Sequence, residues 1–320
     1  MRPGERTLRL LLEPIAGFLA APGVTEIVCQ RPCVVGVETL GAWAWHDVPE
    51  LTYDRLDGIA TLAAAMSQQD VGPSTPLCGS TLPDGERIQI CRPPIVDAGT
   101  ISLTIRRPPS FVPSLVELAE RGVFADTRFV DGSPAPAEGW CQFFVRGVIA
   151  RKTFFLSGDT GSGKTTVARA VAAEIPSDER LVTIEDTAEF GLQHRNLVSL
   201  RYSKGDQGIA RVQSEQLIAA ALRMRPDRIL MQELRDGAAW AFVRSVCSGH
   251  PGSITTCHAK SAEGAFDALA LMLKESDAGK HLADADAATL LRSSIDIIAH
   301  CERRPGGARV VSEVYLRRTA

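Results

Sequence analysis

Residues 154–166, which read FFLSGDTGSGKTT, have the residue types and the spacing that binding a phosphate chain requires. An apolar run ends in a loop of pattern G-x-x-x-x-G-K-T, and residues 167–175 continue at helical spacing, as expected for a phosphate-binding loop between a strand and a helix. The glycines let the backbone turn tightly, so that amides and the positive helix end face the anion. We expect a nucleoside triphosphate site lined by Gly158, Asp159, Thr160, Gly161, Ser162, Gly163, Lys164, Thr165 and Thr166.

Two side chains of this loop have specific expected roles. Lys164 is expected to reach the β- and γ-phosphates as a point charge, and the hydroxyl of Thr165 is expected to bind Mg²⁺. The loop by itself does not specify which nucleotide is bound or what its energy is used for.

An acidic residue follows a second apolar run. Residues 228–231 read RILM and predict a buried strand, after which come Gln232 and Glu233. Taken alone, an acid at the end of a strand is usually just solvated. Downstream of a phosphate loop, however, such an acid handles Mg²⁺ and the attacking water, so a catalytic role is the better interpretation of Glu233.

Two further stretches leave alternatives open. Residues 183–189, TIEDTAE, place Glu185, Asp186 and Glu189 close together, which indicates either a solvated acidic turn or carboxylates that use a cation or base chemistry. Residues 249–259, GHPGSITTCHA, carry His250 and His258 around a turn and a β-type run. These are either one core and one surface histidine or part of a site, and a zinc pair is disfavoured because no third ligand has metal-site spacing.

The composition is that of an ordinary globular chain. Its 320 residues are 45% hydrophobic and 23% charged, which predicts about two domains. The net charge of −3 gives no global basic field, so direct nucleic-acid binding is not expected. Eight cysteines without a C-x-x-C pair indicate reduced, mostly buried thiols and a cytosolic compartment.

The N-terminus resembles a signal peptide only superficially. Glu13 and Pro14 interrupt the apolar run, and the hydrophobic residues between 8 and 19 follow the spacing of an amphipathic helix. No window approaches the roughly 20 apolar residues of a membrane span, so we expect membrane association only through partners.

The pattern of elements divides the chain at a region rich in turn formers. Residues 1–106 predict a smaller α+β domain, with a helix, strands at 26–29, 34–38 and 42–46, a helix at 51–66, a loop at 71–82, and strands at 87–91 and 100–106. Residues 107–139 are expected to be a linker containing a short helix. Residues 140–320 alternate strands with helices and predict an α/β domain, a parallel sheet with helices on both faces.

These stretches together resemble the hexameric secretion ATPases, and within them the type IV secretion traffic ATPases that energise conjugation and effector export. The four signatures occur in the family's order, at 158–165, 183–189, 228–236 and 249–259. The resemblance extends to the N-terminal half through PGVTEIVCQRP at 22–32 and GERIQICRPPIVDAGTISLTIRRPPS at 85–110.

The resemblance implies a RecA-like P-loop NTPase domain at the C-terminal end, ATP with Mg²⁺, and hydrolysis that powers assembly of a bacterial type IV secretion system or transport through it. It also implies a homohexameric ring, peripheral at the cytoplasmic face of the inner membrane. The partners it implies are inner-membrane components of the secretion machine and other secretion ATPases.

The resemblance also assigns residue roles. It implies that Glu233 is the base or water-positioning carboxylate and that Glu185 and Glu189 assist. It also implies that His250 and His258 sense the γ-phosphate or link its loss to movement. It further implies that basic residues of the N-terminal domain approach the nucleotide, at positions that match Arg87 and Arg106. Arg223 and Arg225 are further candidates for contacts between subunits, or solvated surface residues.

One position departs from the family pattern, which usually has glycine where this chain has Gln232. A side chain here is expected to crowd or hydrogen-bond the γ-phosphate region. Gln232 therefore leaves open a nucleotide-gated interaction module with little hydrolysis. A separate alternative is a type II secretion or pilus ATPase of the same superfamily, although neither a cysteine-rich metal insertion nor a longer N-terminal module is visible. A nucleic-acid motor is disfavoured by the acidic charge and by the lack of an aromatic and basic platform.

Overall fold

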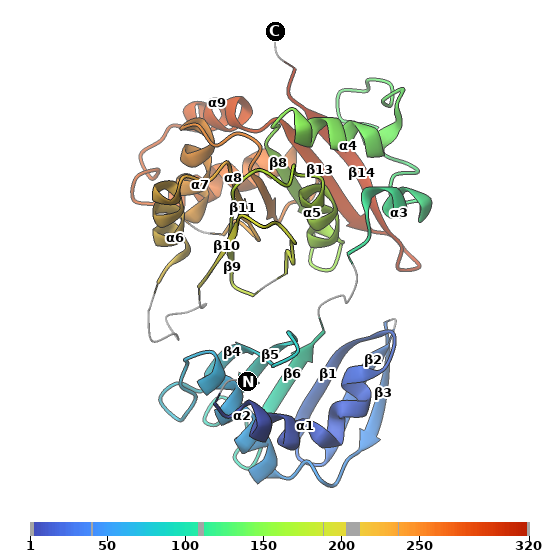
Figure 1. The fold of residues 1–320 in the computed structure, drawn as a ribbon, viewed down its shortest axis with the longest axis vertical. Helices are drawn as coiled ribbons and strands as arrows, with labels where there is room; N and C mark the ends of the chain where they lie inside the picture. Colours follow the sequence, from blue (N-terminus) through green and yellow to red (C-terminus); the bar gives the residue numbers. More distant parts are fainter. Residues whose placement is uncertain are drawn as a thin grey trace. The chain divides into compact units, whose positions relative to one another are not determined.

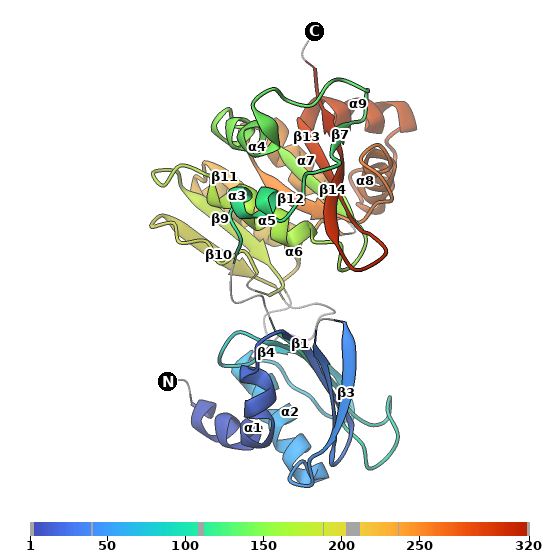
Figure 2. The same cartoon turned by 90° about the vertical axis from the view of Figure 1, so that its right-hand side faces the viewer.

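The computed structural model describes residues 3–39, 41–107, 112–187, 189–202, 212–235 and 237–318. The chain forms two compact units, one of residues 1–111 with 202–212 and one of residues 112–201 with 213–320 (Figures 1 and 2).

The first unit is a six-stranded antiparallel sheet in the order β3-β2-β1-β6-β5-β4. Its helices α1 and α2 lie together on one face of the sheet (Figure 2). The elements are α1 (Glu5–Ala20), β1 (Val24–Arg31), β2 (Val34–Thr39), β3 (Ala42–Asp47), α2 (Tyr53–Met66), β4 (Leu77–Thr81), β5 (Arg87–Cys91) and β6 (Ser102–Arg106).

The hydrophobic pattern explains this layer. Leu8, Leu12 and Ile15 recur at helical spacing and are buried, so α1 presents one apolar stripe to the sheet, as predicted. The expected loop at 71–82 is partly wrong, because residues 77–81 form β4 and pair with β5. Its turn-forming residues concealed a strand in which Cys78 and Ser80 alternate as buried positions.

The second unit is built on an eight-stranded sheet in the order β10-β9-β11-β12-β8-β13-β14-β7. The strands from β10 to β13 run parallel, whereas β14 is antiparallel to β13. The elements are α3 (Leu115–Glu120), β7 (Arg128–Phe129), α4 (Gly139–Ile149), β8 (Phe154–Gly158), α5 (Lys164–Ala173), β9 (Leu181–Glu185), β10 (Leu197–Arg201), α6 (Ser214–Ala221), η2 (Leu222–Met224), β11 (Arg228–Met231), α7 (Ala238–Cys247), β12 (Ile254–Cys257), α8 (Gly264–Glu275), α9 (Asp284–Ser294), β13 (Ile297–Arg303) and β14 (Arg309–Leu316).

Helices cover both faces of this sheet, with α3, α4 and α5 on one face and α6 to α9 on the other (Figures 1 and 2). Strand β8 shows why the sheet needs helices on both faces, because apolar side chains of this strand point alternately to one face and the other. Phe154 lies 6.2 Å from the Phe144 ring of α4, and Phe155 lies 5.8 Å from the Phe242 ring of α7. A strand buried on both faces is typical of a parallel sheet in an α/β domain, as the sequence predicted.

The expected linker at 107–139 differs from the structure, in which residues from 112 onward belong to the second unit. A capping box starts α3, where the Ser114 amide donates to Glu117 Oε2 at 2.8 Å. Strand β7 pairs with β14, and the Phe129 ring packs 4.8 Å from that of Trp140. The sequence predicted a linker because turn-forming residues dominate this stretch. The contacts that attach the stretch to the second unit include residues far along the chain, which a local pattern does not reveal. Pro108 and Pro109 lie outside the described residues.

The eight cysteines are all free thiols. Within the described ranges, no helix is both long and apolar enough to cross a membrane.

Candidate active site

The phosphate loop lies between the end of β8 and the start of α5. Gly158, Gly161 and Gly163 have positive φ angles of 143°, 75° and 98°, a region that favours glycine. At Gly158 the close approach of another strand adds to this requirement. A Cβ there would lie 2.0 Å from the carbonyl oxygen of Cys301 on β13. The loop can therefore keep this path only with glycine at its first position.

Lys164 is the first residue of α5, and it is buried with 7% exposure. Its Nζ donates hydrogen bonds to the carbonyl oxygens of Gly158 and Asp159, both at 2.8 Å. Burial lowers the pKa of Lys164, and the nearby carboxylate of Glu233 opposes that shift. Carbonyl groups solvate the ammonium without neutralising it, so the geometry favours an anionic ligand at the head of α5.

The parallel register brings three predicted side chains to the same edge of the sheet as the loop. Glu185 ends β9, Glu233 follows β11 by two residues, and His258 follows β12 directly. Strands β9, β11, β12 and β8 are adjacent and parallel in that order. Because ligands in such sheets bind outside the carboxyl ends of the strands, this edge is the candidate site.

Each oxygen of the Glu233 carboxylate lies close to a basic side chain. His258 Nε2 lies 2.7 Å from its Oε1, and the guanidinium of Arg235 pairs with its Oε2. The Glu233 side chain is 17% exposed, whereas that of His258 is 44% exposed. A carboxylate fixed in this way has a defined direction, which a base or water-positioning group needs.

Glu185 has a different environment from the rest of the acidic stretch. It is buried, and its Oε1 accepts the amides of Glu189 and Phe190, both at 2.8 Å. Its Oε2 accepts the hydroxyl of Thr183 at 3.1 Å, and burial raises the pKa of the Glu185 carboxyl. Glu185 therefore fastens the turn from inside, while Glu189 is half-buried on that turn.

Gln232 is also engaged with this turn. It is 6% exposed, and its Oε1 accepts the amides of Asp186 at 3.0 Å and Thr187 at 3.4 Å. The side chain expected to reach the γ-phosphate region is thus hydrogen-bonded to the backbone of the neighbouring strand end.

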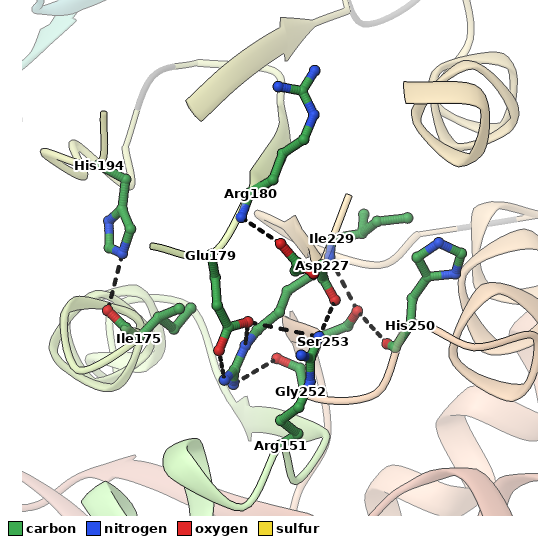
Figure 3. Close-up of polar contacts among 11 residues, drawn as sticks. Arg151, Ile175, Glu179, Arg180, His194, Asp227, Ile229, His250, Gly252 and Ser253 are labelled. Atoms are coloured by element: carbon green, nitrogen blue, oxygen red, sulfur yellow. Dashed lines mark hydrogen bonds and ion pairs between the residues drawn. The ribbon is translucent and has the colours of Figure 1, made fainter. Parts of the chain in front are cut away.

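The structure does not bring His250 together with the loop, so of its two expected roles only the link between phosphate loss and movement stays a prediction. His250 precedes β12 and His258 follows it, so the strand places them at opposite edges of the sheet. His250 Nδ1 lies 3.2 Å from the Ser245 carbonyl. The His250 carbonyl accepts the Ser253 hydroxyl at 2.9 Å (Figure 3). Because the strand lies between the two histidines in sequence, its length separates them in space.

The amino-terminal edge of the sheet is held by a buried ion pair close to His250. Arg228 is fully buried and binds Glu179 through two hydrogen bonds, of 2.7 and 2.6 Å. Arg151 donates to the carbonyl of Asp227 at 2.7 Å and lies 3.6 Å from the same glutamate (Figure 3). This cluster joins the segments that precede three strands, so its role is structural.

The candidate arginines lie in several places. Arg87 on β5 and Arg106 on β6 are direct register partners in the first unit. Arg223 lies in η2, and Arg225 follows it with a positive φ of 54°.

Sequence reasoning missed Arg309, the first residue of β14. Its Nε donates to the Gly161 carbonyl at 3.1 Å, so this cation lies against the phosphate loop. The only local signal is a hairpin sequence at 303–309, RRPGGAR, and nothing in it predicts that the hairpin reaches the loop.

The chain is similar to known proteins over most of its length. Residues 144–303 match the family model described as type II/IV secretion system protein. The VirB11 protein of Bartonella quintana is 43% identical over 95% of this chain and 91% of the relative. That of Agrobacterium fabrum is 42% identical over 97% and 93%. The chain belongs to the VirB11 family.

Solved structures extend the comparison. The VirB11 ATPase from the Brucella suis type IV secretion system, solved in complex with sulphate, is 38% identical to this chain. The structural match covers 97% of each chain and has a TM-score of 0.52. The pilus retraction motor PilT with bound ADP is 18% identical, with a TM-score of 0.64 over 98% of this chain and 83% of that one, and so shows the fold alone. The VirB11-family chain is thus a nucleotide-binding ATPase of type IV secretion with a RecA-like domain, which confirms the predicted fold class and function.

Proposed function

We propose that this VirB11-family ATPase binds ATP with Mg²⁺ at the phosphate loop and hydrolyses it by in-line attack of water on the γ-phosphate. The observation that carries the proposal is the buried Lys164 ammonium, which donates hydrogen bonds to the Gly158 and Asp159 carbonyls. The negative charge of the nearby Glu233 carboxylate favours the charged form of this lysine. A buried cation with neutral partners, beside an oriented carboxylate, fits a site that binds phosphate and activates water.

The loop residues fit this ligand. The positive φ angles of the glycines give the loop the tight path that a phosphate-binding turn requires. Ser162 Oγ is buried with no hydrogen-bond partner in the part of the chain that is described. Thr165 follows Lys164 in α5, where its hydroxyl would hold Mg²⁺. That ion would neutralise developing charge on the β- and γ-phosphate oxygens.

The proposed division of labour follows the geometry. Lys164 binds the phosphates, Glu233 orients and deprotonates the attacking water, and His258 holds Glu233. Glu185 shapes the acidic turn, from which Glu189 assists. His250 is left out of the catalytic set, because its contacts lie at the other edge of the sheet.

Arg87 and Arg106 are proposed to act as arginine fingers that neutralise charge on the transferred phosphoryl group. Their pairing on adjacent strands supports this role, since it places two cations side by side. Arg106→Ala should then lower turnover more than it lowers ring assembly. Loss of the ring instead would make Arg106 structural.

The working unit is proposed to be a homohexamer, peripheral at the cytoplasmic face of the bacterial inner membrane. Its proposed partners are inner-membrane components of the secretion machine and other secretion ATPases. The family membership supports these assignments.

The decisive experiment measures phosphate release with ATP and Mg²⁺, with the particle mass followed by light scattering. Turnover by a particle of about six times 34.4 kDa is expected. Lys164→Ala should abolish binding or turnover. Lys280→Ala should change neither, because that side chain is 52% exposed and pairs with Asp277. A chain that binds ATP without releasing phosphate would instead be a nucleotide-gated module.

A further inference from the structure

Gln232 joins the carboxyl ends of two neighbouring strands. Its backbone amide donates to the Ile184 carbonyl of β9 at 3.0 Å, which continues the ladder one residue beyond β11. Its side-chain Oε1 then accepts the amides of Asp186 and Thr187, at 3.0 and 3.4 Å. Because these donors are backbone N–H groups, the network fixes which end of the side-chain amide is the oxygen.

The turn after β9 is therefore fastened at both ends by side-chain acceptors. Gln232 binds the amides of residues 186 and 187, and Glu185 binds those of residues 189 and 190. Both acceptors are buried, at 6% and 2% exposure, so water does not replace either freely.

Gln232 is also linked to the strand on its other side. Its carbonyl accepts the Thr256 hydroxyl at 2.8 Å, and the next backbone link runs from the Leu234 amide to the Thr256 carbonyl, also at 2.8 Å. Glu233 lies between these two links. The residue that holds the acidic turn is thus rigidly joined to the backbone that carries the carboxylate.

We propose that Gln232 is a positioning residue whose side-chain oxygen holds the acidic turn, and with it Glu189, at a fixed place relative to Glu233. This inference rests on the proposed hydrolysis at this edge of the sheet. It assigns a function to the position at which the chain departs from the family's usual glycine.

Glutamine suits this task better than the two obvious alternatives. Glycine would leave the amides of residues 186 and 187 without this acceptor. Glutamate would supply the acceptor but would add a negative charge next to Glu233 and near Glu185. Repulsion between these like charges would destabilise that arrangement. A neutral side chain of this length provides the acceptor alone.

The first test measures hydrogen exchange in the absence of nucleotide. Gln232→Met keeps the side-chain length and removes the acceptor, so peptides that cover residues 186–187 should exchange about tenfold faster, the effect of losing one net hydrogen bond. The matched control is Gln193→Met, an exposed glutamine on the segment after the turn, which should leave this exchange unchanged. Unchanged exchange in Gln232→Met would overturn the proposal.

The second test separates positioning from a merely structural role. Gln232→Met should lower kcat about tenfold with little change in the KM for ATP, since the nucleotide-binding loop is untouched. Gln232→Glu keeps the acceptor and should restore slow exchange at 186–187. If Gln232→Glu exchanged as fast as Gln232→Met, the acceptor role would be wrong.

The two proposals fail in distinguishable ways. Absence of turnover in the wild-type chain would refute the proposed hydrolysis, whereas the exchange comparison would still decide whether Gln232 fastens the turn. If Gln232→Met does not fold, Gln232→Gly removes the same acceptor, and its exchange at 186–187 takes the place of the methionine variant.

Discussion

His258 Nε2 lies 2.7 Å from Glu233 Oε1, although the two residues follow different strands of the sheet. The guanidinium of Arg235 pairs with the other carboxylate oxygen. The relationship links the histidine stretch to the acidic strand end through one contact. If Glu233 orients the attacking water as proposed, this contact gives His258 a route by which to affect hydrolysis.

Glu233→Gln should lower kcat by about 10²–10⁴-fold while nucleotide affinity is retained, because the variant keeps the shape and loses the proton acceptor. His258→Ala should cause a smaller loss, since Arg235 still holds one oxygen. Phosphate release and a fluorescent-nucleotide titration measure the two quantities. His281→Ala, an exposed histidine, is the control. Wild-type turnover in Glu233→Gln would remove Glu233 from the catalytic set.

The buried carboxyl of Glu185 predicts a pH dependence of stability. Burial raises its pKa, so the folded chain holds the proton more tightly than the unfolded chain does, and ionisation of Glu185 costs folding free energy as the pH rises above the ordinary pKa. Glu185→Gln removes this cost while its side-chain oxygen can still accept the amides. The stability of the variant relative to wild type should therefore be greater at neutral pH than at about pH 4.5.

Urea unfolding at the two pH values measures this difference. Glu275→Gln, at an exposed position, should show the same difference from wild type at both pH values. A Glu185→Gln variant that is less stable at neutral pH than at acid pH, relative to wild type, would contradict the assigned sign.

Local patterns predicted the parts of the site that are adjacent in sequence. The loop at 158–165, the acid after β11 and the alternation of strands with helices all follow from residue types and periodicity. Parallel register then explains why Glu233 and His258 meet at one edge, since strands that run the same way end together. The type of sheet was therefore predictable from the sequence.

Long-range contacts account for what the sequence did not predict. Nothing near residue 309 indicates that its hairpin reaches Gly161, and nothing near residue 129 indicates that its ring meets Trp140. Likewise, the side chain of Gln232 bonds to amides 46 and 45 residues away, so its engagement depends on strand order. His250 was misplaced for the related reason that a strand separates it from His258.

The buried Arg228–Glu179 pair predicts a large stability effect away from the active edge. Glu179→Gln leaves a fully buried guanidinium without its charged partner, which should cost about 3–5 kcal/mol of unfolding free energy. The surface pair Arg292–Glu263 is the matched comparison, with side chains 49% and 43% exposed. Glu263→Gln should cost no more than about 1 kcal/mol.

Urea unfolding followed by circular dichroism measures both costs. The double variant Glu179→Gln with Arg228→Met should recover part of the loss, because it removes the unpaired charge as well. Equal small costs for the two glutamine variants would show that the buried pair does not hold the amino-terminal edge of the sheet.

Arg309 predicts a contribution to nucleotide binding from outside the predicted motifs. Its Nε donates to the Gly161 carbonyl, so Arg309→Ala should release one fixed point of the phosphate loop and weaken nucleotide affinity about fivefold, the net effect of one hydrogen bond. Arg303 is the control, because it lies directly opposite Arg309 on the same hairpin and is exposed. Arg303→Ala changes the net charge equally and should leave the affinity unchanged.

A third variant separates geometry from charge. Arg309→Lys keeps the cation but loses the planar Nε donor, so it should behave like Arg309→Ala if the arginine acts by holding the loop. Affinity near wild type in Arg309→Lys would mean that the positive charge alone matters. Equal losses in the Arg303 and Arg309 alanine variants would attribute the effect to the charge of the hairpin as a whole, and the contact with Gly161 would then have no role in binding.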